Sequence, residues 1–287
     1  MSKIDFKVLM FGARRTGKTS ILASMLTSFQ EVTSGTNITF SPKTNKTLKK
    51  LQEKREELEH VFNCKTPNDF WEIDPNPTSE IAAYSFNMNH QGSSNEYTVT
   101  FIDIPGEALN DVDRIEEAKE WLSKCDVVII AIDTPHMVEE NGKFNEAFNK
   151  TFTLYNLFVG CDEFYKSCKL ILFVPLKCEK YYHEKRMDEV KWAIRHYYNN
   201  IIAHMKNPKI NSNITMAITP ILTMGDVVFS HFGKNNRGLT ETIAMGGEKF
   251  RPKHVYYKLR NGQAKFSPKY CDQPLVYTLS FISKIIK

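Results

Sequence analysis

The first residues with recognisable chemistry form a glycine-bounded loop near the start of the chain. Gly12 and Gly17 enclose a segment that ends in Lys18 and Thr19, at the spacing of a loop that cradles phosphates. Backbone N–H groups and a helix N-terminus would meet the phosphate charge. Lys18 would reach the β- and γ-phosphates, and the Thr19 hydroxyl would coordinate Mg²⁺. The residues expected to contact the nucleotide here are Gly12, Ala13, Arg14, Arg15, Thr16, Gly17, Lys18, Thr19 and Ser20.

The segments on either side of this loop fit that interpretation. Phe6–Phe11 is an apolar run rich in strand formers, and Thr19–Phe29 carries apolar residues at helical spacing. Strand, loop and helix in this order are the context that a phosphate-binding loop needs. The alternative is a glycine turn with an accidental lysine, which the flanking elements disfavour.

A second motif lies at the end of an apolar run that stops at Asp103. A carboxylate in this position can hold Mg²⁺, usually through water. Gly106 follows three residues later, and Asp-x-x-Gly is typical of GTPases, in which the glycine N–H senses the γ-phosphate and the next segment switches. Glu107 stands where small GTPases carry the glutamine that orients water. Its carboxylate could position water but adds negative charge, so we expect hydrolysis to be slow or to need a partner.

A third motif points to recognition of a base. GTPases read guanine with Asn/Thr-Lys-x-Asp after a strand, and Lys177 fits the lysine that lies along the base. Glu179 could replace the aspartate, whereas Leu176 does not match the first, polar position. Thr223, Met224 and Gly225 follow the last predicted strand and could offer backbone N–H groups to the base oxygen. The alternative is a surface Lys-x-Glu at the end of a buried strand.

Two roles have competing candidates. The first switch needs a threonine that meets Mg²⁺ and the γ-phosphate, and Thr78 is our choice because it directly precedes the second predicted strand. Three threonines between residues 33 and 39 compete with it. Arg14 and Arg15 stand where small GTPases usually carry small residues. One of them could supply a cation to the transition state, as arginine fingers do, or both could face solvent or a partner.

The elements that must position these motifs alternate between strand and helix. A turn at residues 90–95 joins the second and third strands into an antiparallel hairpin. We therefore predict an α/β, three-layer P-loop NTPase fold, with a mostly parallel sheet, one antiparallel strand and helices on both faces. Strands are predicted at Phe6–Phe11, Ile81–Met88, Tyr97–Ile104, Asp126–Ile132, Lys169–Val174 and Ile214–Leu222, and helices at Thr19–Phe29, Ser41–Phe62, Asp111–Ser123, Asn145–Tyr165, Glu184–Met205 and Asp272–Ile286.

Length and composition indicate one globular domain over residues 1–287. We predict a helical insertion near residues 41–66 and an irregular insertion near residues 226–270 before the C-terminal helix. The chain has 41% hydrophobic and 25% charged residues, which is ordinary for a globular protein. No apolar run reaches the roughly 18 residues of a membrane span, and the first residues do not form a secretory signal.

Cysteines and charge give weaker indications. Six scattered cysteines lack metal-type spacing, so we expect free thiols and a cytoplasmic protein. The net charge is +5, and the chain from Ala203 onward holds 13 Lys and Arg against 4 Asp and Glu. Because no nucleic-acid motif accompanies this charge, we interpret it as a solvated surface and do not expect nucleic acid as a partner.

The order of the motifs resembles the translation-factor-related class of P-loop GTPases across residues 4–225. It is most similar to the bacterial double-GTPase family of conflict and defence systems. The resemblance implies that Lys177 and Glu179 belong to the family's own guanine motif, and that GTP or GDP with Mg²⁺ is bound. It also implies a bacterial or phage-related source and a protein effector or second GTPase as partner, with nucleotide-dependent oligomers as one form. The similar segments are Gly17–Ser20, Asp103–Glu107, Pro175–Tyr181, Thr219–Gly225 and Tyr270–Leu275.

Three functions are compatible with these motifs. The first is a GTP-hydrolysing switch that recruits an effector, and the second is an ATPase or kinase-like P-loop enzyme. The third is a nucleotide-binding scaffold that hydrolyses little. Comparing GTP with ATP binding separates the first from the second, and multiple-turnover phosphate release separates the first from the third.

Overall fold

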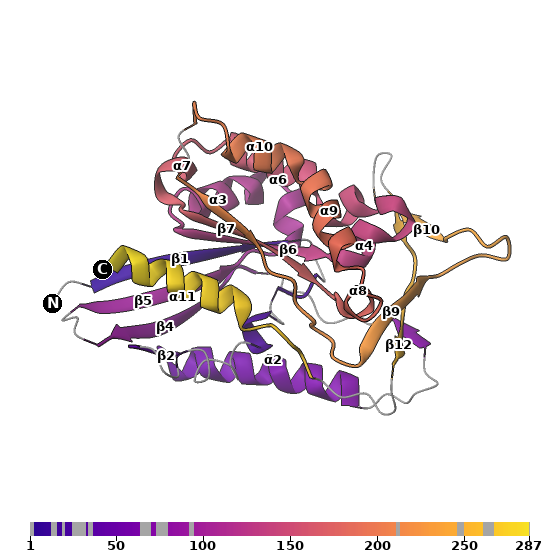
Figure 1. The fold of residues 1–287 in the computed structure, drawn as a ribbon, viewed down its shortest axis with the longest axis horizontal. Coiled ribbons are helices and arrows are strands. Elements are labelled where there is room, and N and C mark those ends of the chain that lie inside the picture. Colours follow the sequence, from indigo (N-terminus) through magenta and orange to yellow (C-terminus); the bar gives the residue numbers. More distant parts are fainter. Residues whose placement is uncertain are drawn as a thin grey trace.

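A seven-stranded sheet forms the middle of the computed structural model (Figure 1). The structure describes residues 3–12, 16–18, 21–24, 33, 37–63, 70–72, 80–91, 95–210, 213–245, 250–260 and 267–286. Across the sheet the strand order is β2-β4-β5-β1-β6-β7-β8. The strands are β1 (Lys3–Phe11), β2 (Ile38–Pro42), β4 (Ala82–His90), β5 (Glu96–Asp103), β6 (Val127–Asp133), β7 (Leu170–Leu176) and β8 (Thr215–Ile218).

Strand direction in this sheet matches the prediction. β1 is parallel to β5 and β6, and β7 is parallel to β6 and β8. β4 runs antiparallel to both of its neighbours, β2 and β5, so it is the one antiparallel strand of the sheet. Every residue of β6 and β7 is buried, as continuous apolar strands of a parallel sheet should be. The predicted fold class is confirmed.

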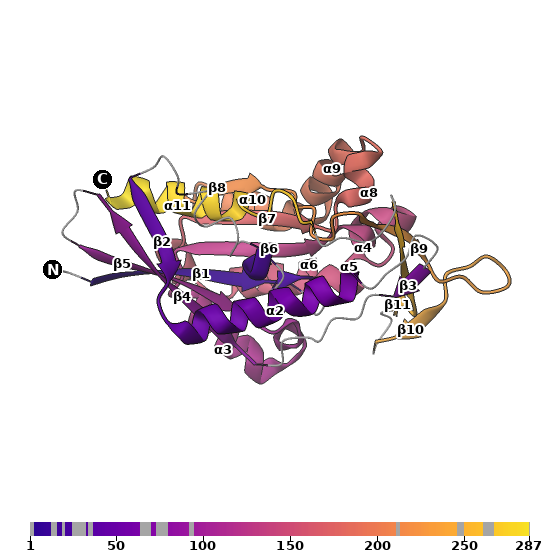
Figure 2. The same cartoon turned by 90° about the horizontal axis from the view of Figure 1, so that it is seen from below.

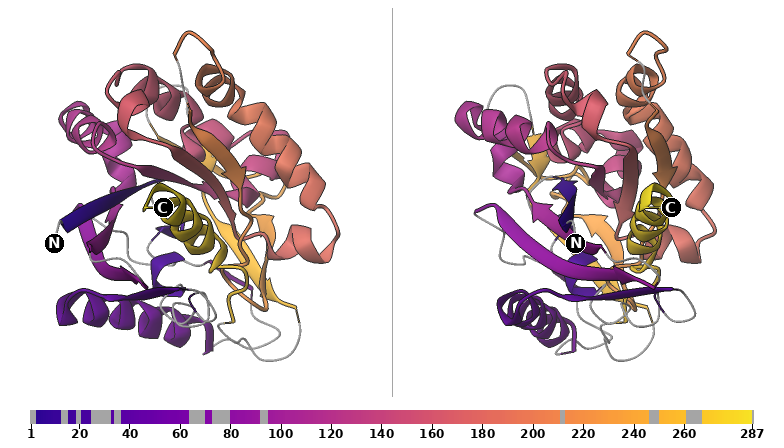
Figure 3. Two further views of the ribbon diagram at one scale, coloured as in Figure 1. Left: turned by 60° about the vertical axis from the view of Figure 1, so that its left-hand side comes forward. Right: turned by 90° about the vertical axis from the view of Figure 1, so that its left-hand side faces the viewer.

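Helices cover both faces of the sheet (Figures 2 and 3). Successive side chains of a strand point to opposite faces, so Leu9 joins one apolar cluster and Val8 the other. The first cluster is completed by α3 (Val112–Leu122), α6 (Thr151–Val159), α9 (Met187–Tyr197) and α10 (Asn199–Met205), and the second by α2 (Asn45–Asn63) and α11 (Gln273–Ile286).

The start of α2 differs from the prediction of a helix over Ser41–Phe62. Ser41 and Pro42 instead end β2, an edge strand, where proline's missing N–H costs no ladder bond. The helix begins later because Thr44 caps it: its hydroxyl accepts a hydrogen bond from the N–H of Thr47 at 3.1 Å.

Two long predicted helices are also interrupted. The helix predicted over Asn145–Tyr165 is broken at Lys150, which has a φ of 54°. The helix predicted over Glu184–Met205 is divided at Tyr198. Local periodicity did not reveal either break. The short elements in this part of the chain are η1 (Gly106–Asn110), α4 (Thr134–Val138), η2 (Glu139–Gly142), α5 (Asn145–Asn149), α7 (Phe164–Ser167) and α8 (Glu179–His183).

A second, smaller sheet lies where the sequence predicts an irregular insertion. It has the order β3-β12-β9 and appears at the right of Figure 1. The expectation of irregular structure near residues 226–270 was wrong because these strands are short, and β12 pairs with β3 from a distant segment for which the sequence predicts neither a helix nor a strand. The elements are β3 (Phe70–Glu72), β9 (Val227–Phe232) and β12 (Val255–Leu259), with a separate hairpin of β10 (Thr242–Ala244) and β11 (Phe250–Pro252).

The small sheet has its own apolar core. Phe229 and Phe232 of β9 pack edge-on at 5.0 Å between ring centroids, and Tyr257 of β12 packs against Phe229. Phe144 and Met224 bring the main body into the same cluster. The division of the chain into domains and insertions otherwise stays a prediction.

Cysteines and helices of the described residues add two findings. The described cysteines 125, 161, 168, 178 and 271 are all buried free thiols. Within the described part of the chain, no helix is both long and apolar enough to cross a membrane.

Candidate functional site

The predicted motifs meet at one edge of the main sheet. β1, β5, β6 and β7 are parallel, so their carboxyl ends lie at the same edge, beside the small sheet (Figure 1). Gly12 follows β1, Asp103 ends β5, and Lys177 follows β7. Ligands of open α/β sheets bind outside the carboxyl ends of the strands.

The loop after β1 closes on itself through Lys18. The Lys18 ammonium donates a hydrogen bond to the carbonyl oxygen of Gly12 at 2.9 Å, and the residue is only 6% exposed. A helix starts here, since the N–H of Ile21 donates to the carbonyl of Gly17 at 3.1 Å. Ala13, Arg14, Arg15, Thr19 and Ser20 lie outside the described residues.

Gly12 sits where no larger residue fits. A Cβ atom at this position would lie 2.7 Å from the carbonyl oxygen of Ala131 and 3.0 Å from the hydroxyl of Thr16. Its φ is +154°, which L-residues rarely adopt, and Gly17 has a φ of +102°. Ala131 belongs to β6, so Gly12 lets the loop pass directly over the neighbouring strand.

We expect Gly12→Ala to destabilise the fold by about 3 kcal/mol or more, because overpacking and backbone strain add up there. Denaturant unfolding measures the loss. Gly238→Ala is the matched control: Gly238 also has a positive φ, +74°, but a Cβ atom there would meet nothing within 4 Å. That control should cost only about 1–2 kcal/mol. Equal losses would mean that backbone angle alone, and not contact with Ala131, requires glycine.

Lys18 and Asp103 place opposite charges together beneath this loop. Asp103 is fully buried and pairs with Met10 of β1 in the sheet. Burial lowers the pKa of Lys18, and the nearby Asp103 carboxylate counteracts this. Burial also raises the pKa of Tyr84 to about 12, with Asp103 adding to the rise. A buried ammonium can bind the phosphates of a nucleotide, and a buried carboxylate can bind the metal ion that accompanies them.

The predicted switch segment begins directly after Asp103. Gly106 is buried and opens η1, and Pro105 precedes it in an extended conformation, with φ −54° and ψ 134°. Glu107 is half-buried in the first turn of η1. Thr78, the predicted first-switch residue, lies outside the described residues.

Glu179 opens α8, directly after β7, and is fully buried. Its Oε1 accepts a hydrogen bond from the N–H of Met224, and the N–H of Gly225 also contributes. Its Oε2 is buried and has no hydrogen-bond partner among the described residues. Burial raises the pKa of Glu179 to about 8, although these N–H groups and Lys177 act in the opposite direction.

Lys177 is held from two sides. Its N–H donates to the hydroxyl of Thr223 at 3.1 Å, and its ammonium binds the Asp133 carboxylate at 2.5 Å. The backbone at Lys177 is left-handed, with a φ of 58°. Sequence reasoning therefore placed Lys177, Glu179 and Thr223 in one site, and the structure brings these three together.

Asp133 and Tyr257 are the site residues that sequence reasoning missed. Asp133 ends the apolar strand β6 at the same edge as Asp103, and this position was the available signal. Tyr257 had none, because its strand pairs only with distant segments.

The described residues contain no cluster of three or more His, Cys, Asp or Glu side chains that could hold a metal. Magnesium in P-loop proteins is held mainly by phosphates, water, one hydroxyl and one carboxylate, so such a cluster is not required. Asp103 fits the carboxylate role. Thr19 and Thr78, the other predicted ligands, lie outside the described residues.

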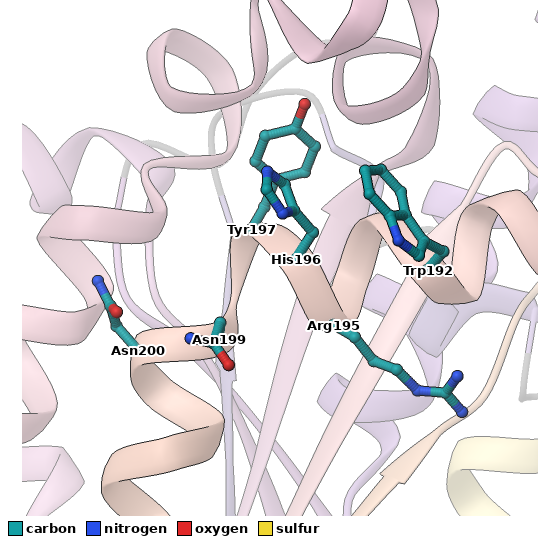
Figure 4. A pocket seen from close by; sticks show the side chains of 6 residues that line it. All are labelled: Trp192, Arg195, His196, Tyr197, Asn199 and Asn200. Atoms are coloured by element: carbon teal, nitrogen blue, oxygen red, sulfur yellow. The ribbon is translucent and has the colours of Figure 1, made fainter.

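A separate pocket lies on the outer surface of α9 and α10 (Figure 4). Its volume is about 410 Å³. The side chains in Figure 4 point in different directions and do not converge on one point, so we assign no site there. The lining residues are Trp192, Arg195, His196, Tyr197, Asn199 and Asn200.

The sheet topology and the residues at its edge are those of an α/β P-loop protein. The family model of Double-GTPase 2 matches residues 8–207, which is more than half of the chain. The chain therefore belongs to the Double-GTPase 2 family, and the predicted resemblance is confirmed. No curated protein matches the sequence.

Solved structures similar to this chain include GTPase-like domains. One is the S. cerevisiae Ski7 GTPase-like domain bound to GTP, with a TM-score of 0.33, 14% identity, and coverage of 76% of this chain and 42% of that one. The same domain bound to GDP and inorganic phosphate has a TM-score of 0.34 and 14% identity, with coverage of 85% of this chain and 47% of that one. Sup35 complexed with GDP has a TM-score of 0.34 and 9% identity, with coverage of 77% of this chain and 38% of that one. The chain spans less than half the length of each.

Proposed function

We propose that this protein is a Mg²⁺-dependent switch that binds and hydrolyses GTP. The observation that carries the choice of guanine is Glu179 Oε2, a buried carboxylate oxygen with no hydrogen-bond partner among the described residues. Buried acceptors without a partner are rare in folded proteins and call for an explanation. The N1–H and amino groups of guanine are donors that a carboxylate can accept, whereas adenine offers no such pair. Membership of the Double-GTPase 2 family supports the same choice.

On the phosphate side, the chain's own residues provide positioning and charge. Lys18 exchanges its bond to the Gly12 carbonyl for the β- and γ-phosphates, and the loop amides complete the cradle. Mg²⁺, when bound through Thr19, Asp103 and the phosphates, neutralises charge that develops during phosphoryl transfer. Thr78 is our proposal for the first-switch ligand.

Glu107 and the two loop arginines are the proposed determinants of rate. Glu107 is next to Gly106 and orients the attacking water, at the cost of a negative charge close to the γ-phosphate. Arg14 or Arg15 supplies the compensating cation. These assignments predict slow turnover that a partner accelerates, and the partner we propose is an effector or a second GTPase in a bacterial, cytoplasmic defence system.

Three measurements test the proposed function. Nucleotide extracted from the purified protein and identified by mass should be GTP or GDP. Titrations should show tighter binding of GTP than of ATP, and phosphate release over many turnovers should require Mg²⁺. Equal affinity for ATP would favour an ATP-hydrolysing P-loop enzyme, and binding without phosphate release would favour a nucleotide-binding scaffold.

The affinity for GTP should rise with pH up to about 8. The carboxylate form of Glu179 accepts from guanine, but burial raises the pKa of Glu179 to about 8, so the free protein holds a proton there at neutral pH. GTP must therefore displace that proton, and affinity gains up to about 10-fold per pH unit below this value. Titrations with GTP between about pH 6 and 9 measure the slope.

The titratable groups next to Glu179 do not change their protonation in the pH range of this titration. Burial raises the pKa of Cys178 and Cys271 well above the usual thiol range, and raises the pKa of Tyr257 to about 12. Asp133 keeps the pKa of Lys177 high despite burial. Tripolyphosphate titrated in the same series reports the ionisation of the phosphates and of Lys18, without any contribution from the base. A GTP affinity with no more pH dependence than tripolyphosphate would contradict the assignment of Glu179.

A further inference from the structure

We propose that Asp133, together with Tyr257 of the small sheet, is a positioning group that holds Lys177 for the base and replaces the polar residue missing at position 176. The inference rests on the proposed function, because it concerns the same nucleotide site. It makes the small sheet part of the base-binding machinery, and not only an appendage to the fold.

The first step is the register of the main sheet. Leu176, the apolar residue in the guanine motif, pairs directly with Asp133 on the neighbouring strand β6. Paired residues of adjacent strands lie side by side, so the polar group absent from one strand is present at the same level on the other. Leu176 is fully buried and cannot take the polar role itself.

The second step is the bond between Asp133 and Lys177. The ammonium nitrogen lies 2.5 Å from Asp133 Oδ2, the Asp133 side chain has no exposed surface, and the Lys177 side chain keeps 15%. Although burial would raise it, Lys177 and His136 hold the pKa of Asp133 well below its usual range. The pair is therefore charged at neutral pH. A charged pair out of water fixes the lysine in one direction.

The third step is that Asp133 is itself anchored. Its Oδ1 accepts from the N–H of His136 at 3.1 Å and lies 2.6 Å from the Nδ1 of the same residue. Its backbone N–H donates to Asn149 Oδ1 at 2.8 Å, and its carbonyl accepts from Asn149 Nδ2 at 3.1 Å. The His136 ring stacks on Phe148 at 3.8 Å. Partners this closely fixed make Asp133 a rigid support.

The fourth step brings in the small sheet. The Tyr257 hydroxyl of β12 accepts a hydrogen bond from Lys177, and Tyr257 is almost fully buried. Phe232 of β9 packs on the His136 ring at 5.2 Å between centroids. Two strands of the small sheet thus contact the lysine and the support beneath its counter-ion. Whatever displaces the small sheet also displaces the base platform.

A double-mutant cycle tests this inference. Asp133→Asn should lower GTP affinity by about 10- to 100-fold, the range of one charge-assisted hydrogen bond, and leave tripolyphosphate affinity unchanged. In a Lys177→Met background, Asp133→Asn should have no further effect, because Asp133 acts through the lysine. Asp126→Asn is the matched control, since Asp126 precedes the same strand at the opposite edge, where it accepts from the N–H of Lys7 at 2.8 Å.

Each outcome of these titrations either supports or overturns the role of Asp133. Additive losses in the cycle, or equal losses of GTP and tripolyphosphate binding, would overturn the inference and leave Asp133 a structural residue. If Asp133→Asn does not fold, Tyr257→Phe gives the same cycle by removing one hydroxyl, with an expected loss of about 3- to 10-fold. Wild-type protein that binds ATP as tightly as GTP would instead refute the proposed function. In that case the same double-mutant cycle, measured with ATP, would still test whether Asp133 acts through Lys177.

Discussion

Lys18→Met is expected to weaken GTP binding by about 30-fold to several thousand-fold, which corresponds to about 2–5 kcal/mol for removing one member of a buried charged contact. The lysine is buried and hydrogen bonds the loop carbonyl of Gly12, so it is already placed inside the phosphate loop. Methionine keeps most of the length of the side chain and removes the ammonium group, with its charge and its hydrogen-bond donors. Titration with GTP and with tripolyphosphate should give the same loss for both ligands.

The control for this variant separates binding from folding. Burial lowers the pKa of Lys18, so its ammonium is costly to the fold, and methionine should not reduce the unfolding free energy. Lys169→Met is the matched variant, because Lys169 also donates to a backbone carbonyl, that of Lys166 at 2.7 Å, before the opposite end of β7. Unchanged GTP affinity in Lys18→Met would remove the phosphate-loop assignment.

Glu179→Gln is expected to abolish the preference for GTP over ATP. The carboxylate is assigned two charge-assisted hydrogen bonds to guanine, each worth about 1.5–3 kcal/mol, so the ratio of affinities should fall by about 100-fold or more. ATP and tripolyphosphate should bind as before. Competition titrations with both nucleotides measure the ratio, and Glu163→Gln, an exposed glutamate before the opposite end of β7, is the control.

Glu179→Gln should weaken the preference for GTP but increase the stability of the fold at high pH. Burial raises the pKa of Glu179 to about 8, above the ordinary value near 4.5, so the folded protein holds this proton more tightly than the unfolded chain. The stability that it contributes is present below about pH 4.5 and is lost as pH rises through 8. Glutamine does not titrate, so the variant should gain stability relative to wild type at high pH. Urea unfolding at several pH values tests this sign.

Most of the main sheet could be predicted from sequence because its signals are local. Buried parallel strands read as apolar runs, so β6 and β7 were expected almost at their observed bounds. Polar residues that follow such runs converge on one edge, and this rule alone assigns Lys18, Asp103 and Lys177 to a common site. The hairpin of β4 and β5 followed from its turn residues.

The features that could not be predicted depend on distant partners. β12 pairs with β9 on one side and with β3 on the other, and neither pairing leaves a local pattern. The break at Lys150 accompanies the two hydrogen bonds of Asn149 to Asp133, which bring the helix end to the sheet edge. Asp133 was visible as an acid after a strand, but its bond to Lys177 depends on the register between β6 and β7.

The small sheet also sets the order in which the two halves of the site can be completed on the ribosome. The phosphate loop, Asp103 and Lys177 all precede Tyr257 and its strand in the sequence, so they leave the ribosome before it. A nascent chain can therefore form the phosphate loop before Tyr257 and β12 are available to contact Lys177. Pairing between β3 and β12 joins the early and late parts of the chain, and this kind of long-range contact forms slowly. We therefore expect the growing protein to bind phosphates before it distinguishes between bases.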